Sequence, residues 1–358
     1  MKRTLCLLLP AVLTAPFAAT PAVAAPEFWK THLESPDYDL DRVESFGKAD
    51  TWFYGEAVVV GEQAPVWHWN GKRLVKTKLP AAFEGSLADV DFAARTNGWA
   101  VGFDREPSGR AKVVVLRWNG KKWRIVRKGN TGTRSSGGPA IKVLGGGAVV
   151  VTGLSRGKTL LQWRFNGKTW KEVETKADLT AFSGRYAVGV FGNGPGLARW
   201  TGKSWKRVKV GALPAVGAKD FLEMEHVEAA SAKDVWVTAD VYKADETGGT
   251  YVVHWNGERW KRIRVPIPVT GVVHDIASDG RGGLWVAAEP ANRDIDTVGT
   301  TTRLLHRLPS GKWKQMPTDV LAFGLARVPG STALWAVGER LPSGPLNVHG
   351  IFTRGGAE

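Results

Sequence analysis

Cysteine is almost absent from this sequence: its 358 residues include one, Cys6. Cys6 lies in an apolar N-terminal stretch that we expect to be removed, so the remaining chain would contain no thiol. This absence excludes disulfides, cysteine nucleophiles and cysteine-based zinc sites, and also the Cys–Tyr cross-link of copper-radical oxidases. We therefore expect no cofactor and no metal site, and stability that comes from packing alone.

Long apolar runs are scarce as well. Residues 4–19 form the one extended apolar stretch, which follows the basic pair Lys2-Arg3 and precedes Ala22-Val23-Ala24, small residues at the spacing that signal peptidase reads. The sequence thus predicts a signal peptide over residues 1–24 and a single domain over residues 25–358, secreted to the extracellular side. No later segment reaches about 18 apolar residues, so we expect no membrane insertion.

A short motif recurs along the rest of the chain: an aromatic residue, a turn pair such as Asn-Gly, and often a second aromatic residue. Its copies lie at residues 69–72, 118–123, 165–170, 200–205, 255–260 and 309–313, with a degenerate seventh copy that ends at Gly355. Asn-Gly between alternating aromatic and β-branched residues is a strong hairpin signal, because a two-residue type I′ turn needs positive φ at both central residues. Each copy therefore predicts two antiparallel strands.

A second landmark, an apolar run often led by tryptophan, precedes each hairpin. The runs begin at Trp52, Trp99, Val149, Tyr186, Trp236, Trp285 and Trp335. A shorter strand-like run lies upstream of most of them, which gives four strands per unit. The hairpin glycines recur about every 47 residues, the period of a propeller blade. The sequence thus predicts an all-β fold, a seven-bladed β-propeller of four-stranded antiparallel blades.

The last repeat lacks its fourth strand, because the chain stops three residues after Gly355. Residues 27–33 resemble the outer strands of other repeats. We therefore predict that this N-terminal strand pairs with the last blade and closes the ring, which would cover strand edges that otherwise invite aggregation.

The repeats carry a resemblance to known proteins. Runs such as Trp99-Ala100-Val101-Gly102, and hairpins such as His254-Trp255-Asn256-Gly257, resemble those of secreted actinobacterial propellers, which are similar in architecture to kelch and galactose-oxidase propellers. The resemblance covers residues 26–358 and is architectural. It implies the fold but no single activity, because propellers carry many functions on one scaffold.

Tryptophan is abundant, with 17 residues. Exposed indole rings stack on sugars, which suggests a carbohydrate site. However, 16 of these residues fall at repeat positions in the predicted second, third or fourth strands. Because a blade packs both faces against its neighbours, we expect these tryptophans to fill the core.

The formal net charge is +15, and the excess concentrates in the predicted fourth strands, at residues 72–78, 121–128 and 203–209. Lysine and arginine on an outer edge prevent edge-to-edge pairing between molecules. Alternatively, such a basic rim could hold an anionic wall polymer by electrostatic attraction. No nucleic-acid-binding module accompanies the charge, so we expect no specific nucleic-acid partner.

Acidic residues follow most of the predicted second strands. The candidate binding residues are Asp104, Glu106, Asp240, Asp245, Glu246, Glu289, Asp294 and Asp296. Propeller topology places these connections around one mouth of the central channel, and three of them are long. We therefore expect them to contact a partner, an extracellular glycan or protein.

The predicted inner strands carry further charged residues. Arg42, Glu44, Asp89 and Asp91 are expected to line the channel, and His226, Glu228, His274 and Asp275 are the candidate acid–base residues if the protein is an enzyme. Carboxylates and imidazoles from different blades would converge at the channel mouth. The alternative is structural: acids at these positions can bond the backbone of a neighbouring strand.

Three functions remain open. The favoured one is a secreted, monomeric, non-enzymatic binding propeller whose ligand is an envelope carbohydrate or protein. The second is an extracellular hydrolase or lyase with a site at the channel mouth, and the third is a structural subunit of a secreted assembly.

Overall fold

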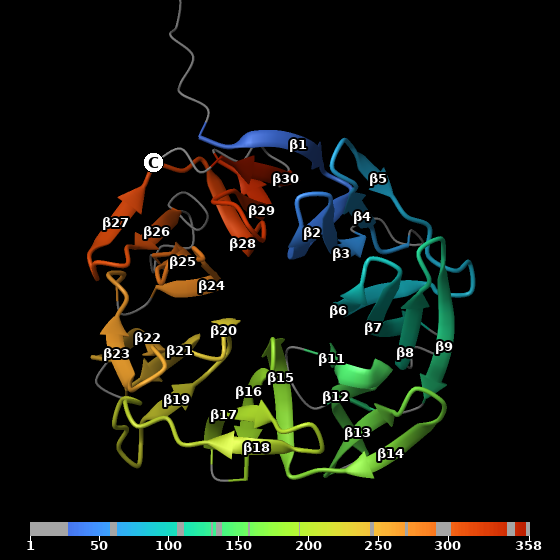
Figure 1. Ribbon diagram of the computed structural model, residues 1–358, viewed down its shortest axis with the longest axis horizontal. Coiled ribbons are helices and arrows are strands. Elements are labelled where there is room, and N and C mark those ends of the chain that lie inside the picture. The colour runs from blue at the N-terminus through green and yellow to red at the C-terminus, as the bar shows by residue number, and fades with distance from the viewer. Residues whose placement is uncertain are drawn as a thin grey trace, which may run out of the picture.

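The computed structural model consists of seven antiparallel sheets arranged as blades of a ring around a central channel (Figure 1). It describes residues 28–57, 63–105, 111–129, 132–133, 138–156, 158–192, 194–243, 247–268, 271–290, 302–341 and 348–355. The predicted all-β, seven-bladed propeller is therefore confirmed. The predicted signal peptide lies outside the described residues.

Each blade has an inner, a second, a third and an outer strand, in that order. Blade 1 is β2 (Tyr38–Gly47), β3 (Asp50–Ala57), β4 (Val66–Trp69) and β5 (Leu74–Lys76); blade 2 is β6 (Gly85–Ala94), β7 (Asn97–Arg105), β8 (Ala111–Trp118) and β9 (Trp123–Gly129). Blade 3 is β10 (Gly132–Thr133) and β11 (Ala140–Val143), both inner, with β12 (Val149–Arg156), β13 (Thr159–Phe165) and β14 (Trp170–Glu174). A 3-10 turn, η1 (Gly145–Gly147), joins β11 to β12.

Blades 4 to 7 repeat this order. Blade 4 is β15 (Ala177–Ser183), β16 (Tyr186–Phe191), β17 (Gly194–Trp200) and β18 (Trp205–Val208); blade 5 is β19 (Phe221–Glu223) and β20 (Val227–Ser231), both inner, with β21 (Asp234–Tyr242), β22 (Gly249–Trp255) and β23 (Trp260–Arg264). Blade 6 is β24 (Val272–Ser278), β25 (Leu284–Glu289), β26 (Arg303–Arg307) and β27 (Trp313–Met316); blade 7 is β28 (Val320–Arg327), β29 (Leu334–Arg340), β30 (His349–Arg354) and β1 (Lys30–Ser35).

The N-terminal strand β1 completes blade 7, as predicted. It pairs antiparallel with β30, from Lys30 opposite Thr353 to Ser35 opposite His349, and lies beside it in Figure 1. The residue before this strand, Trp29, is 1% exposed, and its Nε1 donates a hydrogen bond to Oγ1 of Thr318 at 3.0 Å. Residues from the two ends of the chain therefore close the ring.

Neighbouring blades pack through aromatic side chains. The second-strand Trp52 contacts Trp118 of blade 2 at 5.3 Å between ring centroids, and Trp99 contacts Phe165 of blade 3 at 5.4 Å. All 17 tryptophans lie among the described residues, and every one is buried or half-buried. The predicted core role is confirmed, and no indole lies fully open to a sugar.

Third-strand histidines stack on these second-strand rings. His68 lies on Trp52 with ring centroids 4.2 Å apart, and His254 lies on Trp236 at 3.6 Å. His68 Nε2 also makes a 2.9 Å hydrogen bond with Asp50. These histidines are therefore packed core groups.

Inner strands carry a bulge at a constant place. The pairing of β6 with β7 shifts register between Leu87 and Asp89, opposite Gly102. A Cβ on Gly102 would lie 2.2 Å from the carbonyl oxygen of Ser86, so only glycine permits this approach. In blade 5 the inner strand is interrupted instead, and Thr238 Oγ1 accepts hydrogen bonds from two backbone amides there, Glu225 at 3.4 Å and His226 at 3.0 Å.

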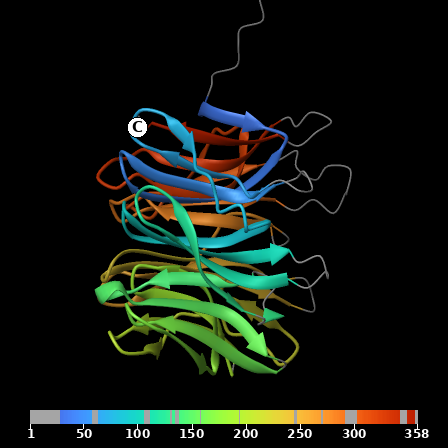
Figure 2. The same cartoon turned by 90° about the vertical axis from the view of Figure 1, so that its right-hand side faces the viewer.

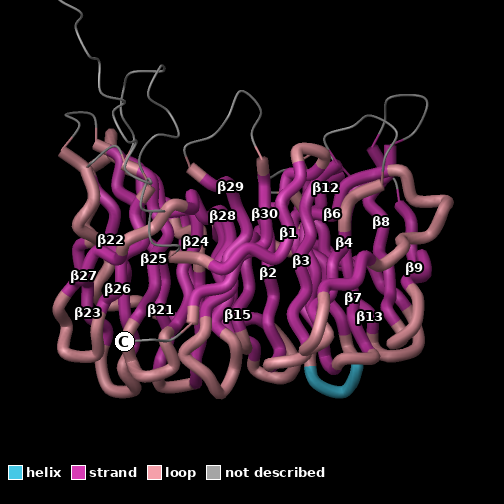
Figure 3. Tube along the Cα trace, turned by 90° about the horizontal axis from the view of Figure 1, so that it is seen from above, coloured by secondary structure: helices cyan, strands magenta, loops and turns pink. Residues whose placement is uncertain are grey.

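The ring is a disc with two faces and a rim (Figures 2 and 3). Second strands end at the upper edge in Figure 3, whereas η1, a first-to-second turn, lies at the lower edge. The outer strand of every blade carries an exposed cation: Lys76, Arg124, Lys171, Lys206, Lys261, Lys314 and Lys30. Among the described residues, no helix is long and apolar enough to cross a membrane.

Candidate functional site: the channel and its upper mouth

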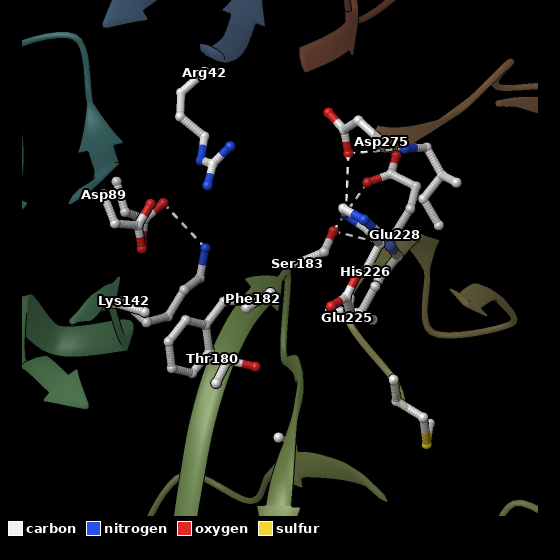
Figure 4. Close-up of a pocket in the computed structure, with 18 of the residues that line it drawn as sticks. Arg42, Asp89, Lys142, Thr180, Phe182, Ser183, Glu225, His226, Glu228 and Asp275 are labelled. Carbon is white, nitrogen blue, oxygen red and sulfur yellow. Dashed lines mark hydrogen bonds and ion pairs between the residues drawn. The ribbon is translucent and has the colours of Figure 1, made fainter. Parts of the chain in front are cut away.

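Two layers of polar side chains line the channel, because successive residues of a strand point to opposite faces and alternate residues of the inner strands therefore face its centre. The first layer contains Arg42, Asp89, His226 and Asp275; the second contains Glu44, Asp91, Lys142, Ser183 and Glu228. Figure 4 shows several of them around the open centre. They border a cavity of about 1170 Å³.

Acids of the first layer bond the backbone of the following blade. Asp89 Oδ2 accepts a hydrogen bond from the Ile141 amide at 2.8 Å, and Asp275 Oδ2 accepts one from the Leu325 amide at 2.8 Å. Burial raises the pKa of both carboxyls to about 6. The same role thus recurs at blades 2 and 6.

The second layer repeats this arrangement. Asp91 Oδ2 accepts from the Val143 amide at 2.6 Å, and Ser183 Oγ accepts from the Ala229 amide at 2.9 Å. Glu228 Oε1 accepts from the Ser278 amide at 3.3 Å, and its Oε2 accepts from Ser183 Oγ at 3.1 Å. These side chains therefore tie successive blades together.

The four candidate acid–base residues divide into separate groups. His226 Nδ1 lies 3.6 Å from Asp275 Oδ1, whereas His274 Nε2 lies 3.3 Å from Glu289 Oε2. Glu228 is engaged by the two serines described above. Burial lowers the pKa of His226 to about 4, against the opposing effect of neighbouring Glu225, so its imidazole is neutral at pH 7.

The channel is acidic, in contrast with the rim. Among the described residues that line the cavity, carboxylates outnumber lysines and arginines by eight to four. Lys142 Nζ lies 3.0 Å from Asp91, while the Arg42 guanidinium, 49% exposed, contacts Asp41 at 3.5 Å. Burial, together with the negative charge of Asp91, raises the pKa of Glu44 well above its ordinary value. A cation entering the channel would therefore be stabilised.

The cavity reaches the upper edge of the ring over blades 4 and 5, where apolar side chains are exposed. Val190 at the end of β16 is 55% exposed and Phe221 at the start of β19 is 57% exposed, and both line the cavity. Tyr242 at the end of β21, 55% exposed, lies opposite Phe221 with ring centroids 6.3 Å apart. We call Val190, Phe221 and Tyr242 the apolar mouth.

Acids surround the apolar mouth. Glu223 and Glu225 line the cavity beside Phe221, and Asp240 pairs with Glu223 across β19 and β21. Burial and the negative charge of Glu223 raise the pKa of Asp240 to about 6. Burial, Asp240 and Glu223 raise the pKa of Tyr242 to about 12. The local potential is therefore negative.

The apolar mouth could not be predicted from the sequence, because single apolar residues near loops carry no periodic signal.

The predicted binding acids that the structure describes lie in different surroundings. Asp104 is buried and its Oδ2 bonds Lys128 at 2.6 Å, Glu289 faces His274, and Asp240 borders the mouth. Glu106, Asp245, Glu246, Asp294 and Asp296 lie outside the described residues. Their role stays a prediction.

Metal binding has no visible basis in the described part of the chain. No group of three or more His, Cys, Asp or Glu side chains is placed there to hold an ion. The charged groups of the channel instead pair with one another or with backbone amides.

Comparison with known proteins places the chain by fold. No protein-family model and no curated protein matches the sequence. The structure described as YCF48 bound to D1 peptide matches 94% of this chain and 99% of its own, with a TM-score of 0.56 and 15% identity. A PL25 ulvan lyase matches over 90% and 96%, with a TM-score of 0.52 and 7% identity. The shared property is the β-propeller fold.

A third solved structure, a puromycin-hydrolyzing peptidase of Mycobacterium tuberculosis, matches over 85% of this chain and 49% of its own length, with a TM-score of 0.51 and 12% identity. The three structures are described by peptide binding, polysaccharide cleavage and puromycin hydrolysis. Since one fold carries all of these, function has to be argued from the site.

Proposed function

We propose that this chain is a non-catalytic binding propeller that holds an extended segment of a partner protein at the apolar mouth. One observation carries the proposal: the large cavity joins an acidic channel to exposed Val190 and Phe221 at one edge of the ring. Exposed apolar groups beside buried charge are typical of recognition surfaces.

A protein segment fits this surface better than a glycan does. The site offers apolar side chains of different shapes, and its two exposed aromatic rings are inclined by 39° to each other, so they form no flat platform. Carboxylates next to them favour a segment that carries lysine or arginine as well as an apolar anchor. The solved propeller described as bound to a D1 peptide supports the compatibility of this ring shape with a peptide ligand.

An extracellular hydrolase or lyase is the second candidate, and the observation that favours it is the His226–Asp275 pair open to the channel. Two facts weigh against it. Both Asp275 oxygens accept backbone amides, from Ile276 and Leu325, and the second imidazole of the candidate set is held apart by Glu289. The bond from the Leu325 amide ties blade 6 to blade 7.

We further propose that the chain acts outside the cytoplasm after removal of residues 1–24, and that its basic rim retains it on anionic polymers. The exposed cations in all seven outer strands support this second point. Retention of purified protein on an immobilised anionic polymer should fall steeply with salt, because exposed charges are screened within about 10 Å at 0.1 M.

The test of the binding proposal is selection from a random peptide library displayed on phage, with the Kd of enriched peptides measured by fluorescence polarisation. Peptides with an apolar anchor and a basic residue should be enriched. The double variant Phe221→Ala/Tyr242→Ala should weaken them at least about tenfold, the effect of losing roughly 1.4 kcal/mol.

Val126→Ala is the matched control, since Val126 is an exposed apolar residue, 38% accessible, on the outer strand β9. It should leave peptide affinity unchanged. A glycan array run in parallel covers the other ligand class. The proposal is wrong if no peptide is enriched, or if enriched peptides bind the double variant as well as they bind the natural protein.

A further inference from the structure

One blade lacks the aromatic side chain that the other six carry at one position of the second strand. Trp52, Trp99 and Trp236 stand opposite a histidine or arginine of the third strand, in register with His68, Arg117 and His254. In blade 3 the residue in this register is Val150, opposite Arg164. A valine therefore occupies the place of an indole.

The missing ring leaves Arg164 without the contact that its counterparts make. The Arg117 guanidinium lies 5.1 Å from the centroid of Trp99, and Arg199 lies 5.9 Å from that of Tyr186. Arg164 instead bonds Oε1 of Gln162, at 2.9 Å from Nη2. Its planar group thus borders space that a ring fills elsewhere.

Trp200, the indole that faces this place from blade 4, also lacks an aromatic partner there. Trp118, at the start of the hairpin turn in blade 2, contacts Trp52 of the preceding blade at 5.3 Å. Its counterpart Trp200 contacts Trp205 of its own blade at 5.4 Å, and within the described part of the chain it meets no ring from blade 3. Trp200 is half-buried and faces the gap.

A cavity of about 330 Å³ occupies this place, bordered by Val150, Arg164 and Trp200. This volume is within the range of small-molecule sites, roughly 300–1000 Å³. Lys171 and Lys203 also line it, and no carboxylate does among the described lining residues. Its other walls include Leu144, beside η1 at the lower edge of the ring. The cavity therefore combines apolar walls with positive charge.

We propose that this cavity is a binding site for a small anion built on a flat aromatic ring. The ring takes the place of the absent indole, between the guanidinium of Arg164 and the indole of Trp200. The carboxylate or phosphate group of the ligand lies near Lys171 and Lys203. This site is separate from the apolar mouth and does not depend on the function proposed there.

The test uses three probes on the full chain: indole-3-acetate, which has ring and anion; tryptamine, which has the ring and a cation; and acetate, which has the anion alone. Saturation-transfer difference NMR and calorimetry give the affinities. Indole-3-acetate should bind at least about tenfold more tightly than either of the other two probes. Acetate lacks the ring that contacts the Arg164 guanidinium, and tryptamine lacks the anion that pairs with the lysines.

Val150→Trp restores the ring of the other blades inside the molecule. It should abolish indole-3-acetate binding, and thermal unfolding should show that the variant remains folded. Lys203→Ala, a change of an exposed residue, should weaken binding several-fold without affecting the fold, whereas Lys206→Ala removes an equal charge outside the cavity and should have no effect.

Three results would each overturn the proposal: no binding of indole-3-acetate at about 10 mM, a concentration that nearly saturates a site with a Kd of about 1 mM; equal binding of tryptamine; or equal binding of indole-3-acetate to a folded Val150→Trp variant. If Val150→Trp does not fold, the comparison of Lys203→Ala with Lys206→Ala decides, and equal affinities contradict the site.

Discussion

Trp29→Ala removes the side chain that holds the N-terminal strand to the last blade. The indole is 1% exposed and packs in one cluster with Phe352 and Met316. Burying a large aromatic side chain removes about 150–250 Å² from water, and at about 25 cal/mol per Å² this stabilises the fold by about 4–6 kcal/mol. Core replacements of this kind cost about 3–5 kcal/mol. We therefore expect a loss of about 4 kcal/mol.

Urea unfolding at equilibrium measures this loss, and the 16 remaining tryptophans supply the fluorescence signal. Phe221→Ala is the control: Phe221 is 57% exposed, so its replacement should change the free energy of unfolding by less than about 0.5 kcal/mol. Deletion of residues 25–34 should destabilise more than Trp29→Ala, because it also uncovers the edge of β30. Equal stability of Trp29→Ala and Phe221→Ala would refute ring closure by this segment.

Three further outcomes follow from the inner strands. Gly102→Ala places a Cβ 2.2 Å from the Ser86 carbonyl oxygen and should cost about 3 kcal/mol, seen as a lower thermal midpoint; an unchanged midpoint contradicts the close approach. Thr238→Val keeps the side-chain shape but leaves two backbone amides without their acceptor, so urea unfolding should show a loss of about 1–3 kcal/mol. The pKa of His226 is lowered to about 4 in the folded protein, whereas the unfolded chain takes up this proton at about pH 6.5. The natural protein should therefore lose stability as pH falls from 6.5 to 4. His226→Gln has no imidazole to protonate, so its stability relative to the natural protein should rise as pH falls over that interval. A stability difference between the two proteins that does not change with pH contradicts the assignment.

The architecture could be predicted from the sequence because its determinants are local and repeated. The recurring motif forms hairpins, as predicted, but the two-residue Asn-Gly turn is wrong. The pairing of Trp118 with Trp123 leaves four residues in the loop, where Asn119 Oδ1 accepts hydrogen bonds from the amides of Lys121 and Lys122 and Gly120 has φ +88°. The burial of Trp52 and Trp99 follows from their fixed place in the repeat. Even the closing strand carried a local signal, the likeness of residues 27–33 to other outer strands.

The partners of the channel residues could not be predicted, because they depend on how one blade is set against the next. Alternation places Asp89 and Asp91 on one face of a strand but does not show that they accept amides from Ile141 and Val143. Lys142 could have been found, since it occupies the inner-strand position of Asp91 in the following blade. The exposure of Phe221 depends on where the closed propeller places the start of β19, which no sequence pattern indicates.

The distribution of the rim cations has a mechanical consequence. The outer strand β23 carries three exposed cations and no acid, Lys261, Arg262 and Arg264, whereas in β14 the acids Glu172 and Glu174 outnumber Lys171. Attraction to a flat anionic layer would therefore be stronger at blade 5 than at blade 3. Held at blade 5, the disc would stand on its edge in one preferred orientation. Both flat faces would then stay clear of that layer and open to arriving molecules.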